Sequence, residues 1–148
     1  MMKTQRVLRA KATQSTPANA KIVTVRPSKE VMTRQRLPNL VGISQLTAGS
    51  KGISMNLVTI PPGGAAKPHL HRGYETAIYI LAGRVRTRYG PNLTHETINE
   101  VGDFIFIPAD VPHQPINLSD SEPARAIIAR NDPNEQESVE LYHPASTL

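Results

Sequence analysis

Three histidines in two clusters are the residues of this chain best suited to chemistry. His69 and His71 flank one leucine, and His113 follows 42 residues after His71. Residues two apart in a β-strand point to the same side, with Cα atoms about 6 to 7 Å apart, so the first two imidazoles could hold one ion. Glu75, four residues beyond His71, could return to that side after a local turn and supply a carboxylate.

The absence of cysteine limits what such a site can bind. Disulfides, thiolate ligands and thiol nucleophiles are all excluded, so a metal must sit on nitrogen and oxygen. Neutral imidazoles with one carboxylate suit a single divalent transition metal, Fe, Mn, Ni, Zn or Cu, and not Ca or Mg. A His-x-His pair alone also fits exposed or hydrogen-bonded histidines. His95 and His143 fit surface positions better than ligand positions.

The elements that would position these side chains are short strands. Thirteen prolines and nine glycines divide the chain, and no segment keeps a period of 3.6 residues. Runs rich in β-branched and aromatic residues predict strands at 21–25, 53–60, 75–81, 84–89, 95–99, 103–107, 124–129 and near 138–142. This spacing indicates an all-β sandwich or barrel with few or no helices.

Turn residues separate these runs. Turns are expected at 61–64, 82–83, 90–92 and 100–103, with a tight hairpin at Ala82 and Gly83. Pro108, Pro112 and Pro115 surround His113 and interrupt strand pairing there, which favours the rim of a barrel or an edge.

The net charge of +5 is concentrated at the N-terminus. Residues 1–29 carry seven basic side chains and no acid, whereas residues 30–148 carry ten basic and twelve acidic ones, a balance of −2. Residues 1–20 are expected to form a basic, disordered segment. A transit peptide and a nucleic-acid-binding arm are the alternatives. The domain is expected at 21–142, followed by a tail at 143–148.

No membrane span is expected, because no run of about 18 apolar residues occurs. A cytoplasmic location is the default for a chain without cysteine or a secretory signal. Nucleic-acid binding by the domain is not expected, because the domain lacks a basic excess, tryptophan is absent and aromatic residues are few.

The motifs around the histidines resemble the two cupin motifs over about residues 36–142. The first motif, glycine, five residues, His-x-His, three or four residues, Glu, six residues and glycine, is matched with one extra residue before the last glycine. The second, glycine, five residues, Pro-x-Gly, two residues, His, three residues and Asn, is matched with Asp110 at the position of its central glycine. The matching residues are Gly63, His69, His71, Glu75 and Gly83 in the first motif, and Gly102, Pro108, His113 and Asn117 in the second.

This resemblance, closest to small bacterial single-domain cupins, implies a jelly-roll-like, double-stranded β-helix barrel. The metal would lie at its mouth on His69, His71, Glu75 and His113, with one or two positions open for water, substrate or dioxygen. A homodimer built on the outer sheet and exchanged terminal strands is also implied, with residues 22–26 as the candidate strand. Asp110 tolerates the turn conformations that glycine adopts.

Several neighbouring side chains are candidates for supporting roles. If Glu75 faces the interior, Ala77, Tyr79 and Leu81 do so too, and the hydroxyl of Tyr79 could act as a proton donor. A core tyrosine bonded to backbone is the alternative. Gln114 and Asn117 could orient His113 or serve the backbone at a strand end. In the next strand we expect Val85, Thr87 and Tyr89 to face inward and Arg84, Arg86 and Arg88 outward.

These observations favour an enzyme that uses its metal on a small polar organic molecule. Oxygen-dependent cleavage, isomerisation and lyase or decarboxylase chemistry all remain open, because one barrel hosts many reactions. The main alternative is a non-catalytic small-molecule-binding or regulatory cupin with a structural metal.

Overall fold

A computed structural model of the chain describes residues 20–146, except for the side chains of Glu135 and Glu137. Within this range the protein is built from short β-strands. Helical structure is confined to α1 (Gln45–Ala48) and the two 3-10 turns η1 (Pro91–Leu93) and η2 (Glu135–Ser138). The predicted all-β class with few helices is therefore confirmed.

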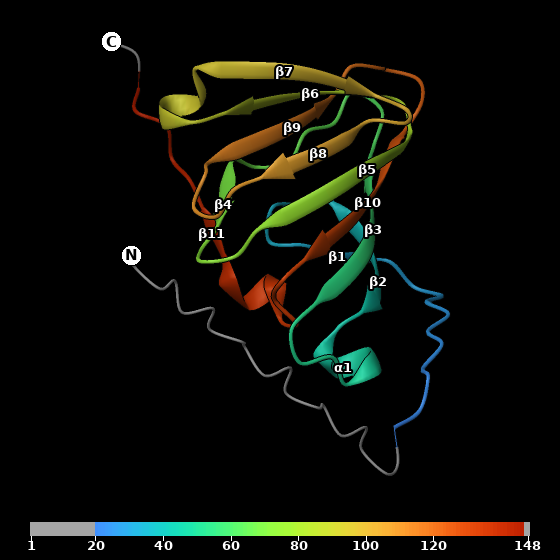
Figure 1. Ribbon diagram of the computed structural model, residues 1–148. Helices are drawn as coiled ribbons and strands as arrows, with labels where there is room; N and C mark the ends of the chain where they lie inside the picture. Colours follow the sequence, from blue (N-terminus) through green and yellow to red (C-terminus); the bar gives the residue numbers. More distant parts are fainter. Residues whose placement is uncertain (1–19, 147–148) are drawn as a thin grey trace, which may run out of the picture.

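The strands form two sheets that wrap around a common interior (Figure 1). The first sheet has the order β1 (Val31–Met32), β2 (Pro38–Ile43), β3 (Ser54–Ile60), β10 (Ala124–Arg130), β5 (Thr76–Ala82) and β8 (Phe104–Ile107). The second has the order β11 (Val139–Leu141), β4 (His69–His71), β9 (His113–Asn117), β6 (Arg84–Tyr89) and β7 (His95–Glu100). Neighbouring strands in both sheets are antiparallel.

The predicted strands at 53–60, 75–81, 84–89, 95–99, 103–107, 124–129 and 138–142 appear within one or two residues of their expected bounds. The strand expected at 21–25 is wrong, because these residues form no regular element. Strand β2 was not expected, since it begins at a proline and contains Gly42. The basic segment predicted at 1–20 lies outside the described residues, apart from residue 20.

Every second side chain along a strand of the first sheet points inward, and these inward-facing side chains differ in chemistry between the two ends of the interior. One interior row crosses the sheet through Ser54, Arg130 and Thr76, which are paired in register and buried. A row further along contains Val58 and Ile80, which belong to the apolar core. One end of the interior is therefore polar and the other apolar.

The turn at Gly83 connects the two sheets. Strand β5 belongs to the first sheet and β6 to the second, so the expected hairpin is instead a crossing between sheets. Gly83 has φ 84°, and a Cβ atom here would lie 2.9 Å from Cα of Ala124. Glycine is required because only a residue without Cβ fits this approach at positive φ.

No helix within residues 20–146 is long and apolar enough to cross a membrane.

Candidate metal centre

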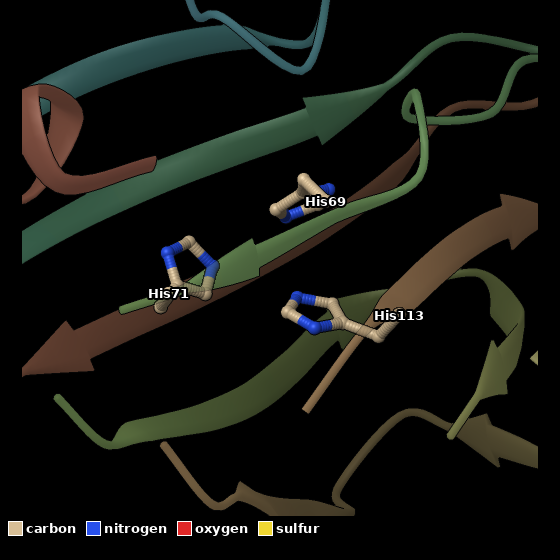
Figure 2. A group of neighbouring side chains, drawn as sticks. All are labelled: His69, His71 and His113. Carbon is tan, nitrogen blue, oxygen red and sulfur yellow. The ribbon is translucent and has the colours of Figure 1, made fainter. Parts of the chain in front are cut away.

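The three motif histidines meet in the second sheet, where β4 pairs with β9. His69 and His113 are register partners on these antiparallel strands, and their ring centroids are 4.3 Å apart. His71 lies two residues beyond His69 on the same side, 5.0 Å from the ring of His69 and 5.1 Å from that of His113. Figure 2 shows the three rings gathered around one space. The pairing of the two strands thus brings together residues 44 positions apart.

The cluster is buried and its donor atoms are close. The three residues are only 2 to 4% exposed, and one ring nitrogen from each lies within 4.8 Å of the others. With metal–nitrogen bonds of about 2.1 Å, two ligands of one ion lie at most about 4.2 Å apart, so a small inward movement of the rings would suffice. The donor set fits a transition metal.

Hydrogen bonds fix the orientation of two of the rings. Nδ1 of His69 lies 2.7 Å from the carbonyl oxygen of Lys67, and Nδ1 of His113 lies 2.9 Å from that of Val111. A carbonyl oxygen only accepts, so each Nδ1 carries the proton and donates it. Each Nε2 therefore keeps its lone pair, in the arrangement that second hydrogen bonds impose on metal-binding histidines.

A buried arginine lies beside the third ring. Arg130 is 6% exposed; its Nη2 donates to Nε2 of His71 at 3.3 Å, and its Nε donates to the hydroxyl of Thr76 at 3.1 Å. The opposite nitrogen of His71, Nδ1, lies 2.8 Å from the hydroxyl of Tyr74. Because the guanidinium only donates, Nε2 of His71 is unprotonated too. An ion bound there would displace this contact with Arg130.

Burial and positive charge keep the three imidazoles neutral. Burial lowers the pKa of His113 to about 4, a hydrogen bond to Val111 opposes this shift, and the charge of Arg130 adds to it. Burial, Arg130 and the two other rings also lower the pKa of His71 far below its ordinary value. Burial and electrostatic interactions with His113 and Arg130 lower the pKa of His69, against the hydrogen bond to Lys67. Neutral imidazole is the form that binds metals.

The structure places Glu75 apart from this cluster. Its side chain is exposed, its backbone N–H donates to Oδ1 of Asn131, and it is not among the grouped donor residues. The following residue, Thr76, is 1% exposed and takes the inward position beside Arg130. Three of the four predicted ligands are therefore brought together, and the fourth is not.

The strand that follows Glu75 has the opposite orientation to the predicted one. Ile78 and Ile80 belong to or pack against the core, whereas Ala77 and Leu81 are exposed. Tyr79 lies on the outer side, where its ring packs 4.8 Å from that of Phe104. This places its hydroxyl on the other side of the sheet from the histidines, so the geometry gives no support to a catalytic Tyr79.

One feature of the sequence could have revealed this orientation. With six residues between it and Gly83, the carboxylate position of the first cupin motif falls on Thr76 and not on Glu75. The extra residue in that motif was therefore a sign of a shifted register. Tyr74, which contacts His71, was not singled out by the sequence analysis, and no spacing rule would have found it.

Asp110 connects the two histidine clusters. It has φ 66°, its N–H donates to the carbonyl oxygen of His71 at 3.0 Å, and its Oδ1 accepts from the N–H of Gly73 at 3.0 Å. Aspartate thus adopts the left-handed turn usually made by glycine. The loop that leads to His113 is tied to the end of β4 by these bonds.

The two amides predicted near the metal serve the backbone. Nε2 of Gln114 donates to the carbonyl oxygen of Ala66 at 3.0 Å. Nδ2 of Asn117 donates to the carbonyl oxygens of Ile60, Pro61 and Glu122, and its Oδ1 accepts from the N–H of Ser119. Both contact patterns match the alternative role at a strand end.

Two cavities reach the histidines. A small one of about 40 Å³ is lined by Gln35, His69, His113 and Arg130 together with aliphatic side chains. A larger one of about 330 Å³ is lined by residues of β6, β7 and β8, and by His113. The lining shared by the two cavities is Thr87, Ile107 and His113. His113 thus borders a space of ligand size.

A two-sheet double-stranded β-helix with a histidine cluster inside one end is the class of protein that this fold and site define. The family profile described as "Cupin domain" matches residues 56–130, which is half of the chain. The protein therefore belongs to the cupin domain family. No curated protein matches the sequence.

Solved structures of similar fold include enzymes. A recombinant oxalate oxidase in complex with glycolate is 20% identical, with a TM-score of 0.62 over 74% of this chain and 56% of that chain. The oxalate decarboxylase of Lactobacillus farciminis, in a formate complex, is 19% identical, with a TM-score of 0.63 over 87% of this chain and 39% of that chain. This chain thus spans about half of the first enzyme and two fifths of the second.

A third structure matches almost end to end. It is an uncharacterized protein with a double-stranded β-helix domain from Klebsiella pneumoniae, 16% identical, with a TM-score of 0.60 over 84% of this chain and 99% of that chain. At these identities the similarity concerns the fold.

Proposed function

We propose that this protein binds one divalent transition metal ion through His69, His71 and His113 and uses it on a small organic molecule. The observation that carries the proposal is the buried group of three neutral imidazoles, two of them oriented by backbone carbonyls. Three protein ligands leave positions on a transition metal for water or substrate. When bound, such an ion polarises a carbonyl or carboxylate or acidifies a water molecule.

The ion is one of Fe, Ni, Zn and Cu, which imidazole ligands suit, or Mn, which a structural neighbour contains. Structural neighbours named oxalate oxidase and oxalate decarboxylase support enzymatic chemistry on a small acid, within oxygen-dependent cleavage, isomerisation or lyase and decarboxylase reactions. One of these neighbours, from Bacillus subtilis, is described as having Mn(II) centres.

Elemental analysis of protein purified without added metal tests the proposal. We expect close to one transition metal per chain, and oxygen-uptake screening with small organic acids then separates redox from non-redox chemistry. Protein that stays metal-free after incubation with each of the five metals would contradict it.

The contact between Arg130 and His71 favours a second candidate, a non-catalytic small-molecule-binding or regulatory cupin. Arg130 occupies the Nε2 atom that an ion would need, and no carboxylate among the described side chains joins the cluster. This candidate predicts ligand-induced stabilisation without turnover, measured as a rise in melting temperature.

We also propose that the protein forms a homodimer through the outer side of the first sheet. Phe104 and Phe106 on the edge strand β8 are 84% and 62% exposed. Their register partners on β5 are Tyr79 and Ala77, and the apolar surface continues across β10 to Leu57 and Met55 on β3. Contiguous apolar surface on an edge strand is a site of association. Ile22, which is fully exposed, supports residues 22–26 as an exchanged segment.

A further inference from the structure

An amide side chain inside the barrel carries a buried oxygen atom that lacks a hydrogen-bond partner. Gln35 lies in the turn before β2 and is 3% exposed. No described residue donates a hydrogen bond to its Oε1 atom. A buried acceptor without a donor costs free energy comparable to a lost hydrogen bond, so water or a ligand usually satisfies it. Oε1 of Gln35 is therefore a position at which an ion, a water molecule or a ligand would be stabilising.

Hydrogen bonds fix the turn that carries Gln35 and connect it to the histidines. The N–H and the hydroxyl of Thr33 both donate to the carbonyl oxygen of Leu37, at 3.0 and 2.9 Å, and close the turn. The backbone carbonyl oxygen of Gln35 accepts from the N–H of Lys67 at 2.7 Å. The carbonyl oxygen of Lys67 in turn accepts from Nδ1 of His69. Two hydrogen bonds thus lead from the turn to the first imidazole.

Gln35 lines the same small cavity as two of the histidines. The cavity has a volume of about 40 Å³, and its polar lining is completed by His69, Thr87, His113 and Arg130. A cavity needs roughly 10 to 15 Å³ to hold one water molecule, so a water molecule or an ion fits. Nε2 of each imidazole is unprotonated, and Oε1 of the amide only accepts. Three residues around one small cavity thus offer lone pairs, which favours a bound cation.

We propose that Oε1 of Gln35 is a fourth protein ligand of the ion bound by His69, His71 and His113. The inference rests on the proposed function, because it requires an ion at the histidines. Carbonyl oxygen suits Mn, whereas imidazole suits Fe, Ni, Zn and Cu, so this amide extends the set of metals that the centre accepts. The oxygen ligand expected from Glu75 thus comes from the turn before β2. Four protein ligands leave one or two positions on an ion that accepts five or six.

Calorimetric titration of the full-length, metal-stripped protein with Mn(II) and Zn(II) tests the assignment. Gln35→Leu replaces the amide by an apolar group of similar size. We expect its affinity for Mn(II) to fall at least about tenfold and its affinity for Zn(II) to fall less, since the ligand lost is the one that suits manganese. The melting temperature of the metal-free variant should not fall, because the substitution removes an acceptor that no donor satisfies. Unchanged Mn(II) affinity would show that Oε1 meets only water and would overturn the proposal.

Two further variants separate the ligand role from a structural one. Asn39→Leu is the matched control: Asn39 is 1% exposed and its Oδ1 also lacks a partner among the described residues, but it does not line the cavity at the histidines. Its Mn(II) affinity should stay at the native value. Gln35→Glu keeps an oxygen donor, should bind Mn(II) at least as tightly as the native protein, and remains informative if Gln35→Leu does not fold. Equal losses in Gln35→Leu and Asn39→Leu, or weaker Mn(II) binding by Gln35→Glu than by the native protein, would overturn the proposal.

The same titrations distinguish this inference from the proposed function. Native protein that binds neither metal contradicts the metal centre itself. Native protein that binds both metals, with equal affinities in Gln35→Leu, supports the three-histidine centre and overturns only the role of Gln35. A loss of Mn(II) affinity confined to Gln35→Leu supports both proposals.

Discussion

At the scale of single residues, the centre depends on imidazoles that stay neutral. Carbonyl oxygens of Lys67 and Val111 accept the Nδ1 protons of His69 and His113, so the Nε2 lone pairs are available. The carboxylate expected beside them is replaced by a hydroxyl, that of Thr76, with Arg130 bonded to it. Among the described side chains, no carboxylate joins the three imidazoles.

Removal of one imidazole should remove the metal. His71→Ala is expected to lower the metal content from near one per chain to below about one tenth, because two remaining nitrogen ligands hold an ion weakly. Inductively coupled plasma mass spectrometry measures this. Glu75→Gln is the matched control and should keep its metal, since Glu75 is exposed and lies apart from the cluster. Loss of metal in Glu75→Gln would restore Glu75 as a ligand.

The metal-free protein should lose stability on acidification. The pKa of His113 is about 4 in the folded protein and about 6.5 in the unfolded chain, so the unfolded state binds more protons between these values. The free energy of unfolding is therefore highest above pH 6.5 and falls as the pH drops towards 4. The titration of His113 alone lowers the free energy of unfolding by on the order of 3 kcal/mol over this range, at about 1.4 kcal/mol per pKa unit.

Urea denaturation at several pH values, in the presence of a chelator, measures this dependence. His113→Asn should make the curve less steep between pH 4 and 6.5, because asparagine does not titrate, whereas His69 and His71 still contribute a slope of the same sign. A stability that rises on acidification through this range would contradict the predicted direction.

At the scale of elements, the site is made by strand pairing and by turns that connect the sheets. The pairing of His69 with His113 aligns β4 with β9, and Asp110 ties the loop before β9 to the end of β4. Gly83 lets β5 of one sheet continue into β6 of the other. The positions of the three histidines therefore depend on this strand pairing and on these turns.

Gly83→Ala should destabilise the fold. The new Cβ would lie 2.9 Å from Cα and Cβ of Ala124 at φ 84°, so both a clash and backbone strain are expected. We expect a loss of about 2 to 4 kcal/mol in the free energy of unfolding, measured by chemical denaturation. Gly52→Ala is the control, because nothing lies within 4 Å of its Cβ position. Similar losses in the two variants would show that the contact with Ala124 has no effect.

At the scale of the whole molecule, the two sides of the first sheet have separate roles. Its inner side carries Ser54, Arg130 and Thr76 towards the centre. Its outer side presents apolar residues on β8 and β5, including Phe104 and Tyr79. Inverting the orientation of β5 would exchange these roles, so the register of one strand determines both the site and the association surface.

Phe104→Glu should convert the proposed dimer into a monomer. A charge placed in an apolar interface is costly, since it would be buried without a partner. Light scattering coupled to size exclusion should give about 32 kDa for the native protein, twice the chain mass of 16.2 kDa, and half of that for the variant. Leu46→Glu is the matched control, because Leu46 is 95% exposed on α1. A monomeric native protein would contradict the proposed interface.

Local patterns in the sequence were sufficient to predict the fold class and most of the strands, and to identify the three histidines. Period-two runs and proline or glycine turns act over a few residues, so β3, β6 and β10 are readable without knowledge of their partners. The left-handed turn at Asp110 is likewise a local property, because aspartate tolerates this backbone conformation. The His-x-His pair and His113 are likewise visible as residue types at a defined spacing.

Only the tertiary structure decided which neighbours join the histidines. A shift of one residue in β5 exchanges Glu75 and Tyr79 for Thr76 and Ile80 on the inner side, and pairing with β10 and β8 sets that register. Arg130 on β10 of the first sheet contacts His71 on β4 of the second, and these two residues are 59 positions apart. Long-range contacts of this kind leave no local pattern, so residue spacing identified the ligands but not the charge around them.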